Sequence, residues 1–294
     1  MALDNLIKIP LEENLSYFPS STIGIDIGQS LSKIAYVKDN ELHLLVNPTE
    51  NDHLKVKKFL DSNKNIFSIL NVTGGRGYGL YQHYSGEFKT QLINEFEANV
   101  KGVEIFYQIE KKKDIAPSLV VTIGTGTSIV LRKDKFEHLG GTAMGGAFFM
   151  GLINVLFNIN DFQKAINLAK KGNRYNVDLK VSDIYAPKDP RVDLIFREFT
   201  AASLGKIDLN FNINNLKKED FINSIICMIG ENIGTLANLM AVNNNISNIV
   251  FCGGFLRENK VLMKIISLIC RYNNNKAIFL KNSDFCAAIG ALCI

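Results

Sequence analysis

The sequence is short of several residue types that mark particular classes of protein. It has no tryptophan, four histidines and five cysteines among 294 residues. No two cysteines form a Cys-x-x-Cys pair and the histidines do not cluster, so the sequence offers no zinc site. The odd cysteine count in a chain of this size also argues against a disulfide framework, and we expect unpaired thiols in a reducing compartment.

Long apolar runs and a strong charge imbalance are also missing. We find no apolar run of the roughly 18 residues that cross a bilayer, and residues 1–21 lack the apolar centre of a signal peptide. The net charge is +4, with Lys and Arg interspersed among Asp and Glu, which does not indicate nucleic-acid binding. We therefore expect a cytoplasmic protein whose partners include neither a nucleic acid nor a membrane.

One pattern of strands and turns occurs twice. Residues 22–37 and residues 118–132 each read as a buried strand, a glycine turn and a second strand, and a third strand follows in both places. No linker rich in Gly, Ser or Pro divides the chain. We predict an N-terminal extension outside the fold (residues 1–21) and two related halves, residues 22–116 and 117–294. A long amphipathic helix is expected over residues 219–243.

The first glycine turn has the composition of a phosphate and metal site. Asp26 ends a buried strand, Gly28, Gln29 and Ser30 follow, and Lys33 lies on the next strand. The turn exposes backbone N–H groups to an anion, Asp26 can hold Mg²⁺ through water, and Lys33 can neutralise a phosphate. Alone, this turn is equally consistent with an ordinary hairpin in which Asp26 caps a turn.

Two further turns suit a nucleotide. The second turn contains Gly124, Thr125, Gly126 and Thr127, whose amides and hydroxyls can approach a polyphosphate. It is neither a Walker A loop nor a Rossmann fingerprint, because no Gly-Lys-Ser/Thr follows and a strand continues after it.

The third turn contains Gly253, Gly254 and Phe255, between a buried strand and a helix. Its glycines leave room for an adenine or ribose against the backbone, and the alternative is a tight strand-to-helix turn. Three such turns, two of them in the duplicated pattern, resemble the arrangement in actin, hexokinase and the Hsp70 ATPase domain. This resemblance implies the α/β actin-like ATPase (ribonuclease H-like) fold: two duplicated mixed-sheet halves, with helices around a nucleotide cleft.

The order of motifs from about residue 22 to residue 293 is similar to that of type II pantothenate kinases. The matching segments are residues 24–28, 73–75, 94–98, 123–128, 140–146, 178–181, 183–185, 201–205, 232–234 and 288–292. The resemblance implies a homodimeric kinase that uses ATP and Mg²⁺ to phosphorylate pantothenate to 4′-phosphopantothenate in coenzyme A biosynthesis. It also suggests coenzyme A or its acyl thioesters as feedback ligands.

The resemblance also implies roles for single residues. Glu95 aligns with the family's general base, which accepts the proton of the attacking alcohol, and Glu97 is the competing candidate. Ser128 matches a hydroxyl that holds the substrate. The Gly145–Gly146 turn would lie beside the nucleotide, and Tyr185 falls in a stretch that the family uses near pantothenate and the dimer partner.

The sequence departs from the family pattern at three positions. Gln29 stands where the family has a glycine, Ala147 replaces a third glycine, and His138 stands where the family has an arginine used on the substrate or on the transferring phosphate. An unperturbed histidine is fully charged only below about pH 6.5. The nearby Arg132 and Lys135 are candidates to supply the missing charge.

Two other functions stay open at this point. The first is a kinase of the same fold that acts on another small alcohol or a sugar. The second is a nucleotide-binding protein without catalysis. An activator ATPase for a radical dehydratase would need cysteines for a shared iron–sulfur cluster, and the scattered apolar cysteines argue against that function.

Overall fold

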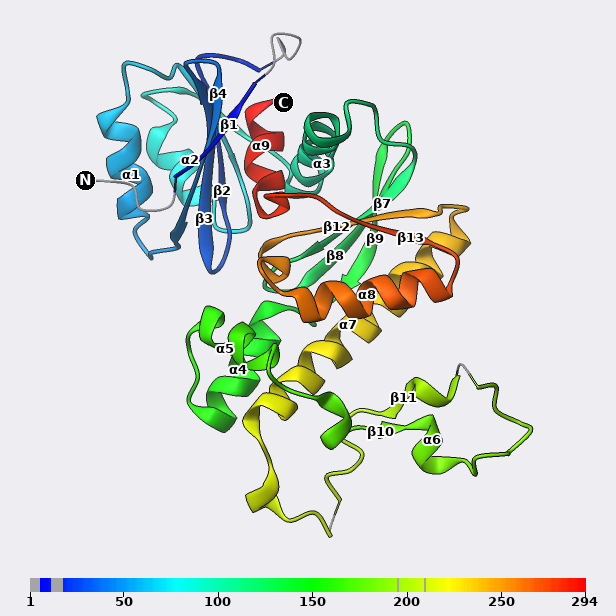
Figure 1. The fold of residues 1–294 in the computed structure, drawn as a ribbon. Coiled ribbons are helices and arrows are strands. Elements are labelled where there is room, and N and C mark those ends of the chain that lie inside the picture. The colour runs from blue at the N-terminus through cyan, green and yellow to red at the C-terminus, as the bar shows by residue number, and fades with distance from the viewer. Residues whose placement is uncertain (1–5, 12–17, 195, 209) are drawn as a thin grey trace.

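The computed structural model describes residues 6–11, 18–194, 196–208 and 210–294, and these form two sheets with helices around and between them (Figure 1). In the described part of the N-terminal sheet six strands lie in the order β1-β4-β3-β2-β5-β6. Their bounds are β1 (Leu6–Pro10), β2 (Thr22–Ile27), β3 (Leu31–Lys38), β4 (Glu41–Pro48), β5 (Ile69–Thr73) and β6 (Lys89–Leu92). Strands β2, β5 and β6 run parallel, and β1 to β4 pair antiparallel.

The C-terminal sheet has the order β13-β12-β7-β8-β9 within the described residues. Its strands are β7 (Ser118–Ile123), β8 (Thr127–Arg132), β9 (Phe136–Thr142), β12 (Asn248–Cys252) and β13 (Lys276–Phe279). β7, β8 and β9 form an antiparallel meander, and β7, β12 and β13 are parallel. The first sheet without β1 has the same pattern, with β2 in the place of β7, so the predicted duplication of the meander is confirmed.

The helices cover both faces of the sheets. On the outer face of the N-terminal sheet lie α1 (Leu54–Ser62) and α2 (Tyr78–Tyr84), and the outer face of the C-terminal sheet is covered by α4 (Gly146–Phe157), α5 (Phe162–Ala169), α7 (Lys218–Asn243) and α8 (Lys260–Tyr272). Between the sheets lie α3 (Glu95–Lys111) and α9 (Cys286–Leu292), whose apolar residues share one core with both sheets (Figure 1). The last helix of the chain therefore packs against the N-terminal sheet.

The backbones of α3 and α9 touch where they cross. A Cβ atom at Gly102 would lie 1.9 Å from the carbonyl oxygen of Cys286, and one at Gly290 would lie 1.8 Å from that of Ala98. Gly24 of β2 faces α9 in the same way, because its Cβ would lie 2.1 Å from the carbonyl oxygen of Ala288. Even one methyl group at these positions would force the helices apart.

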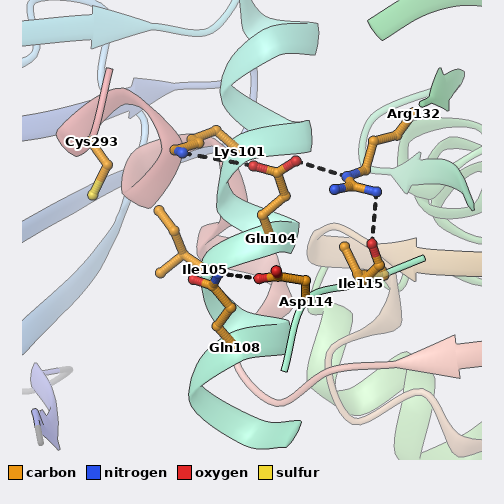
Figure 2. Close-up of a pocket in the computed structure, with 8 residues that line it drawn as sticks. All are labelled: Lys101, Glu104, Ile105, Gln108, Asp114, Ile115, Arg132 and Cys293. Atoms are coloured by element: carbon orange, nitrogen blue, oxygen red, sulfur yellow. Dashed lines mark hydrogen bonds and ion pairs between the residues drawn. The ribbon is translucent and has the colours of Figure 1, made fainter. Parts of the chain in front are cut away.

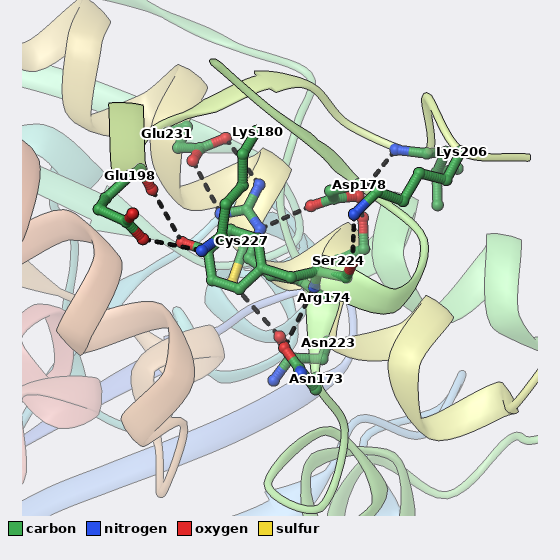
Figure 3. A network of polar contacts seen from close by, with 12 residues as sticks. Asn173, Arg174, Asp178, Lys180, Glu198, Lys206, Asn223, Ser224, Cys227 and Glu231 are labelled. Atoms are coloured by element: carbon green, nitrogen blue, oxygen red, sulfur yellow. Dashed lines mark hydrogen bonds and ion pairs between the residues drawn. The ribbon is translucent and has the colours of Figure 1, made fainter. Parts of the chain in front are cut away.

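A segment between α5 and α7 extends away from the C-terminal sheet (Figure 1). Its elements are η1 (Arg174–Asn176), β10 (Leu179–Lys180), α6 (Val181–Ile184), η2 (Phe196–Glu198), β11 (Thr200–Ala202) and η3 (Ile213–Asn215). Buried Arg174 anchors the segment by donating to Asp178 (2.6 Å) and, from both terminal nitrogens, to Glu231 of α7 (2.7 and 3.1 Å) (Figure 3). Because breaking a buried pair leaves an uncompensated charge, this network fixes the root of the segment.

One expectation from the sequence needs correction. Residues 6–10 are not an arm outside the fold, because β1 is the edge strand of the N-terminal sheet and pairs with β4.

α7 is the one helix in the described ranges that is long and apolar enough to cross a membrane, and 56% of its most apolar stretch is buried. That burial fits the core helix predicted over residues 219–243. The cysteines are free, and Cys293 is the least buried of the five.

Candidate active site

The inner face of the N-terminal sheet carries an ion pair at the end of β2. Asp26 lies opposite Lys33 in the β2–β3 register, and its carboxylate oxygen Oδ2 lies 3.0 Å from the Lys33 Nζ. Both side chains are largely buried. Strand alternation explains the placement, because Ile25 and Ile27 face the outer core while Gly24 and Asp26 face α9. The hairpin turn thus delivers one acid and one cation into the space between the sheets.

Glu95 is the first residue of α3. The helix begins there because the Asn94 side chain accepts hydrogen bonds from the backbone N–H groups of Phe96 (2.9 Å) and Glu97 (3.3 Å). Acidic side chains in the first turn are favoured by the helix dipole. The same cap fixes where the Glu95 carboxylate leaves the helix.

Glu95 and the ion pair act on each other electrostatically. Loss of surrounding water raises the pKa of Glu95, the negative charge of Asp26 raises it further, and Lys33 opposes both. Glu95 is nevertheless exposed, so part of its side chain remains open to solvent. Burial alone would lower the pKa of Lys33, but Asp26, Asp284 and Glu95 together hold it above its ordinary value. Lys33 therefore stays positively charged, and the Glu95 carboxylate accepts a proton more readily than an ordinary glutamate does.

The C-terminal sheet turns Ser128 and His138 toward the same space. Val130 packs in the core shared with α3, so Ser128, two residues earlier on β8, lies on the α3 face. His138 of β9 pairs with Val130, and the register shifts between Ile129 and Val130. A bulge of this kind re-aims a side chain. Here the His138 ring stacks on Phe96 of α3, with ring centroids 4.1 Å apart and planes at 11°.

The second glycine turn packs directly on the start of α4. The N–H of Gly146 donates to the carbonyl of Gly124 (2.7 Å), and the N–H of Ala147 donates to that of Thr125 (3.1 Å). A Cβ at Gly145 would lie 2.6 Å from the carbonyl oxygen of Thr125. Thr127 closes the joint by donating its hydroxyl to the carbonyl of Met144 (2.8 Å). The two predicted phosphate segments therefore form one surface.

The third glycine turn adjoins the second because β7 and β12 are parallel neighbours. Gly253 has a φ of +103°, and a Cβ there would lie 2.5 Å from the carbonyl oxygen of Ile123, so the turn requires glycine. The Leu31 side chain of the first hairpin approaches to 3.9 Å of the position of a Gly254 Cβ. The three turns predicted from the sequence thus meet at one place in the fold.

The first turn is held by a threonine outside the predicted set. The Thr49 hydroxyl donates to the carbonyl of Gly28 (2.9 Å), and its N–H donates to that of Ser30 (2.9 Å). Gln29 and Ser30 remain exposed at the tip of the turn. Their side chains are therefore accessible to a ligand.

Comparison with known sequences decides the family. Residues 41–294 match the Fumble family. Type II pantothenate kinase from Bacillus cereus (strain AH820) is 36% identical over 274 residues, which cover 92% of this chain and 96% of that protein. Type II pantothenate kinase from Oceanobacillus iheyensis is 33% identical over 272 residues, covering 92% and 98%. The chain belongs to the type II pantothenate kinase family.

Solved structures confirm the fold expected for this family member. The activator of the 2-hydroxyisocaproyl-CoA dehydratase from Clostridium difficile superposes with a TM-score of 0.60 at 17% identity and covers 92% of each chain. ROK hexokinase from Thermus thermophilus gives a TM-score of 0.53 at 10% identity, covering 92% of this chain and 96% of that one. At such identities the likeness concerns the fold alone, which is the predicted actin-like ATPase fold.

The structure contradicts three roles that the sequence predicted for residues of this pantothenate kinase family member. The Phe255 ring is buried against Phe149 and Phe162, so it belongs to the core and cannot contact a nucleotide. Arg132 lies at the far end of β8 from Ser128, and Lys135 lies in the turn that follows it. The charge of Arg132 is taken up by Glu104 and not offered to a ligand beside His138, and Lys135 lies in the turn beyond that end of the strand.

Arg132 has other partners. It borders a pocket of about 280 Å³ between α3 and that far end of β8 (Figure 2). Its Nε donates to Glu104 (2.8 Å) and its Nη1 to the carbonyl of Ile115 (2.9 Å). Gln108 donates to Asp114 across the same pocket (2.7 Å). The polar groups that line this pocket are hydrogen-bonded to one another. The pocket lies at the opposite end of β8 from the second glycine turn.

Tyr185 is not brought to the other predicted residues within one chain. It directly follows α6, in the segment that extends away from the sheets (Figure 1). Its ring is partly exposed, and the guanidinium of Arg191 lies 5.7 Å from the ring centroid. Glu95, in contrast, lies at the start of α3, between the sheets.

Besides Thr49, three residues at the site had no role predicted from the sequence. Phe96 stacks on His138, and Gly74, with φ +87°, sits so close to Asp26 that a Cβ would lie 2.5 Å from its Oδ1. Asp284 of η5 (Ser283–Phe285) faces Lys33 across the gap between the sheets. An acid just before the last apolar helix was the available signal for Asp284. The other two needed the tertiary structure.

Proposed function

We propose that this chain is a pantothenate kinase, which transfers the γ-phosphoryl group of ATP to the hydroxyl of pantothenate and releases ADP and 4′-phosphopantothenate for coenzyme A biosynthesis. Family membership supports the substrate class. The observation that carries the chemistry is the position of Glu95, beside Asp26 and Lys33 and at the junction of the two sheets.

Glu95 fits the role of general base. As the pantothenate hydroxyl oxygen attacks the γ-phosphorus, a new O–P bond forms, the bond to the ADP oxygen breaks, and the hydroxyl proton passes to the Glu95 carboxylate. A carboxylate with a raised pKa is better suited to accept that proton than an ordinary surface glutamate. The competing Glu97 lies two residues farther along α3.

The donor chemistry near Asp26 fits Mg²⁺ bound with ATP. Mg²⁺ usually takes one or two carboxylates and fills its other positions with water and phosphate oxygens. Asp26 is a buried carboxylate at the mouth of the first turn, and the described residues hold no cluster of three or more ligands that would make a closed cage. When bound, the ion neutralises charge on the phosphates.

The phosphates of ATP would lie between the first two turns. Gln29, Ser30 and Lys33 approach from the N-terminal sheet, while the turn from Gly124 to Thr127 and the Gly145–Gly146 joint approach from the other. The third turn, at Gly253 and Gly254, would border the nucleoside. Lys33 would stabilise charge on the transferring group, and closure of the halves 22–116 and 117–294 would exclude water.

Pantothenate would bind on the α3 face of β8 and β9. Ser128 offers a hydroxyl to the substrate there, and His138 offers a ring nitrogen whose direction is fixed by the stack on Phe96. A stacked imidazole gives a narrower and weaker anion contact than the forked guanidinium of an arginine. We infer that this site binds the carboxylate of pantothenate less tightly than an arginine-containing site would.

We also propose that the protein works in the cytoplasm as a homodimer and that coenzyme A or an acyl thioester competes at the pantothenate site. Because Tyr185 lies far from Glu95 within one chain, it could reach a catalytic site only in a second copy. This arrangement would make the extended segment part of the dimer contact.

The direct test is phosphorylation of pantothenate by the purified protein with ATP and Mg²⁺, followed by detection of 4′-phosphopantothenate and ADP. Equal amounts of both products confirm the proposal. Phosphorylation of a sugar or another alcohol in preference to pantothenate would indicate a different kinase of this fold. ATP binding without transfer to any acceptor would indicate a nucleotide-binding protein that has lost catalysis.

A further inference from the structure

Asp284 is a carboxylate between the sheets that has no role in the scheme above. It belongs to η5, whose flanking residues Ser283 and Phe285 are buried. The carbonyl of Ser283 accepts a hydrogen bond from the N–H of Gly253 (3.4 Å), which fixes η5 to the third glycine turn. η5 also contacts β3 and α3. Asp284 is thus held where both sheets and α3 meet.

The Asp284 carboxylate lacks a close partner of opposite charge. Among the described residues no cation lies within 4 Å of it, whereas Asp26 has Lys33 at 3.0 Å. Burial raises the pKa of Asp284, and Lys33 and Arg257 oppose that rise from farther away. A half-buried carboxylate in this position is electrostatically costly unless a cation approaches it.

Lys33 is the cation that can move. Its ammonium group pairs with Asp26 on the neighbouring strand, and Asp284 attracts it from η5, which contacts β3. A lysine ammonium is a point charge on a flexible stem, so it can turn from one carboxylate toward another. An ammonium group 3.0 Å from the Asp26 carboxylate repels a divalent cation that approaches the same carboxylate.

We propose that Asp284 is a positioning residue for Lys33: it draws the ammonium away from Asp26, which leaves Asp26 available to Mg²⁺ and holds Lys33 beside the phosphates. This inference rests on the proposed function, because it assumes nucleotide between the glycine turns. It assigns η5, which is hydrogen-bonded to the third turn, a task in phosphate binding.

The test is calorimetry of a non-hydrolysable ATP analogue, with and without Mg²⁺, on the wild type and on Asp284→Asn. Mg²⁺ should strengthen binding of the analogue to the wild type. The factor by which Mg²⁺ raises the affinity is called the Mg²⁺ gain, and Asp284→Asn should reduce it by about tenfold, because Lys33 then keeps its pair with Asp26. Asp284→Glu retains the charge and should recover most of the gain. Asp284→Ser, which removes the carboxylate differently, should behave as Asp284→Asn does.

A double-mutant cycle separates positioning from a merely structural effect. In a Lys33→Met background, Asp284→Asn should change the Mg²⁺ gain by less than about twofold, because its partner is gone. An equal loss in both backgrounds overturns the inference, and so does an unchanged gain in Asp284→Asn. A wild type that binds no analogue would instead overturn the proposed function.

Discussion

Two glutamates two residues apart begin α3, and their surroundings separate them. Glu95 is coupled to Asp26 and Lys33 and has a raised pKa, whereas the Glu97 backbone N–H takes part in the Asn94 cap. Neighbouring charges and loss of water are what convert an ordinary glutamate into a base that works near neutral pH. The difference between the two residues is therefore open to a direct comparison.

Glu95→Gln should lower kcat for pantothenate phosphorylation by about 10²–10⁴-fold, because the amide cannot accept the hydroxyl proton. The matched variant Glu97→Gln should stay within about threefold of wild type. Steady-state kinetics of the two variants decide between them. The reverse result, a large loss only in Glu97→Gln, would move the base to Glu97.

Glu95→Gln should also be slightly more stable than the wild type. A raised carboxyl pKa means that the folded protein binds the proton more tightly than the unfolded chain, so ionisation of Glu95 lowers stability as pH rises through that range. Glu95→Gln removes this charge. At pH 7 its melting temperature should rise by about 1–2 °C, a small gain because the group is open to solvent. A lower melting temperature in calorimetry would contradict this assignment.

The pH dependence should report the same group. kcat/KM for pantothenate should fall on the acid side at a pH above 4.5, the usual glutamate value, because the base is active only when ionised and its pKa is raised. Activity is present above that pKa and is lost as pH falls through it. Rate profiles of the wild type and Glu97→Gln should share this limb. A limb at or below the usual value would argue against Glu95.

For single residues, the sequence predicts only those contacts that follow from local geometry. Asp26 and Lys33 flank one hairpin, so their pairing follows from strand register alone. Phe96 and His138 come from α3 and β9 and Asp284 comes from η5, and no local pattern shows that these elements lie close together. The buried ring of Phe255 was missed for the same reason, because its partners Phe149 and Phe162 lie on other elements.

At the scale of elements, the crossing of α3 and α9 determines how the halves meet. Both helices use glycine at the contact, and the facing atoms are backbone carbonyls, which cannot move aside as a side chain can. Most strands and the long helix were predictable because their apolar periodicity is regular. α2, β6 and the extended segment were not, since their elements are short, and the extended segment depends on tertiary contacts such as that between Arg174 and Glu231.

Gly290→Ala should destabilise the protein by about 1–3 kcal/mol, because the new methyl group would lie 1.8 Å from the carbonyl oxygen of Ala98. The matched control is Gly151→Ala in α4, where a Cβ meets nothing within 4 Å. That control should stabilise the protein by about 0.5–1 kcal/mol through higher helix propensity. Urea denaturation measures both. Equal effects of the two substitutions would show that the α3–α9 contact is looser than described.

At the scale of the whole molecule, the two sheets repeat one topology and place their glycine turns face to face. This relation was readable from the sequence, because the duplicated meander appears as two strand–glycine–strand patterns. The location of Tyr185 was not readable, since nothing local indicates that its segment extends away from the sheets. If Tyr185 serves the pantothenate site, each site must be built from two chains.

Subunit mixing tests that arrangement. Tyr185→Ala and Glu95→Gln should each be impaired alone, but dimers formed from one chain of each should contain one intact site, with Glu95 from the first chain and Tyr185 from the second. An equal mixture of refolded or co-expressed chains should therefore regain about a quarter of wild-type activity, since half the dimers are mixed and each has one working site of two. Affinity tags on the two chains allow the mixed dimer to be isolated and assayed. Mixed dimers that regain no activity, or a protein that sediments as a monomer, would show that Tyr185 does not complete the site of a second copy.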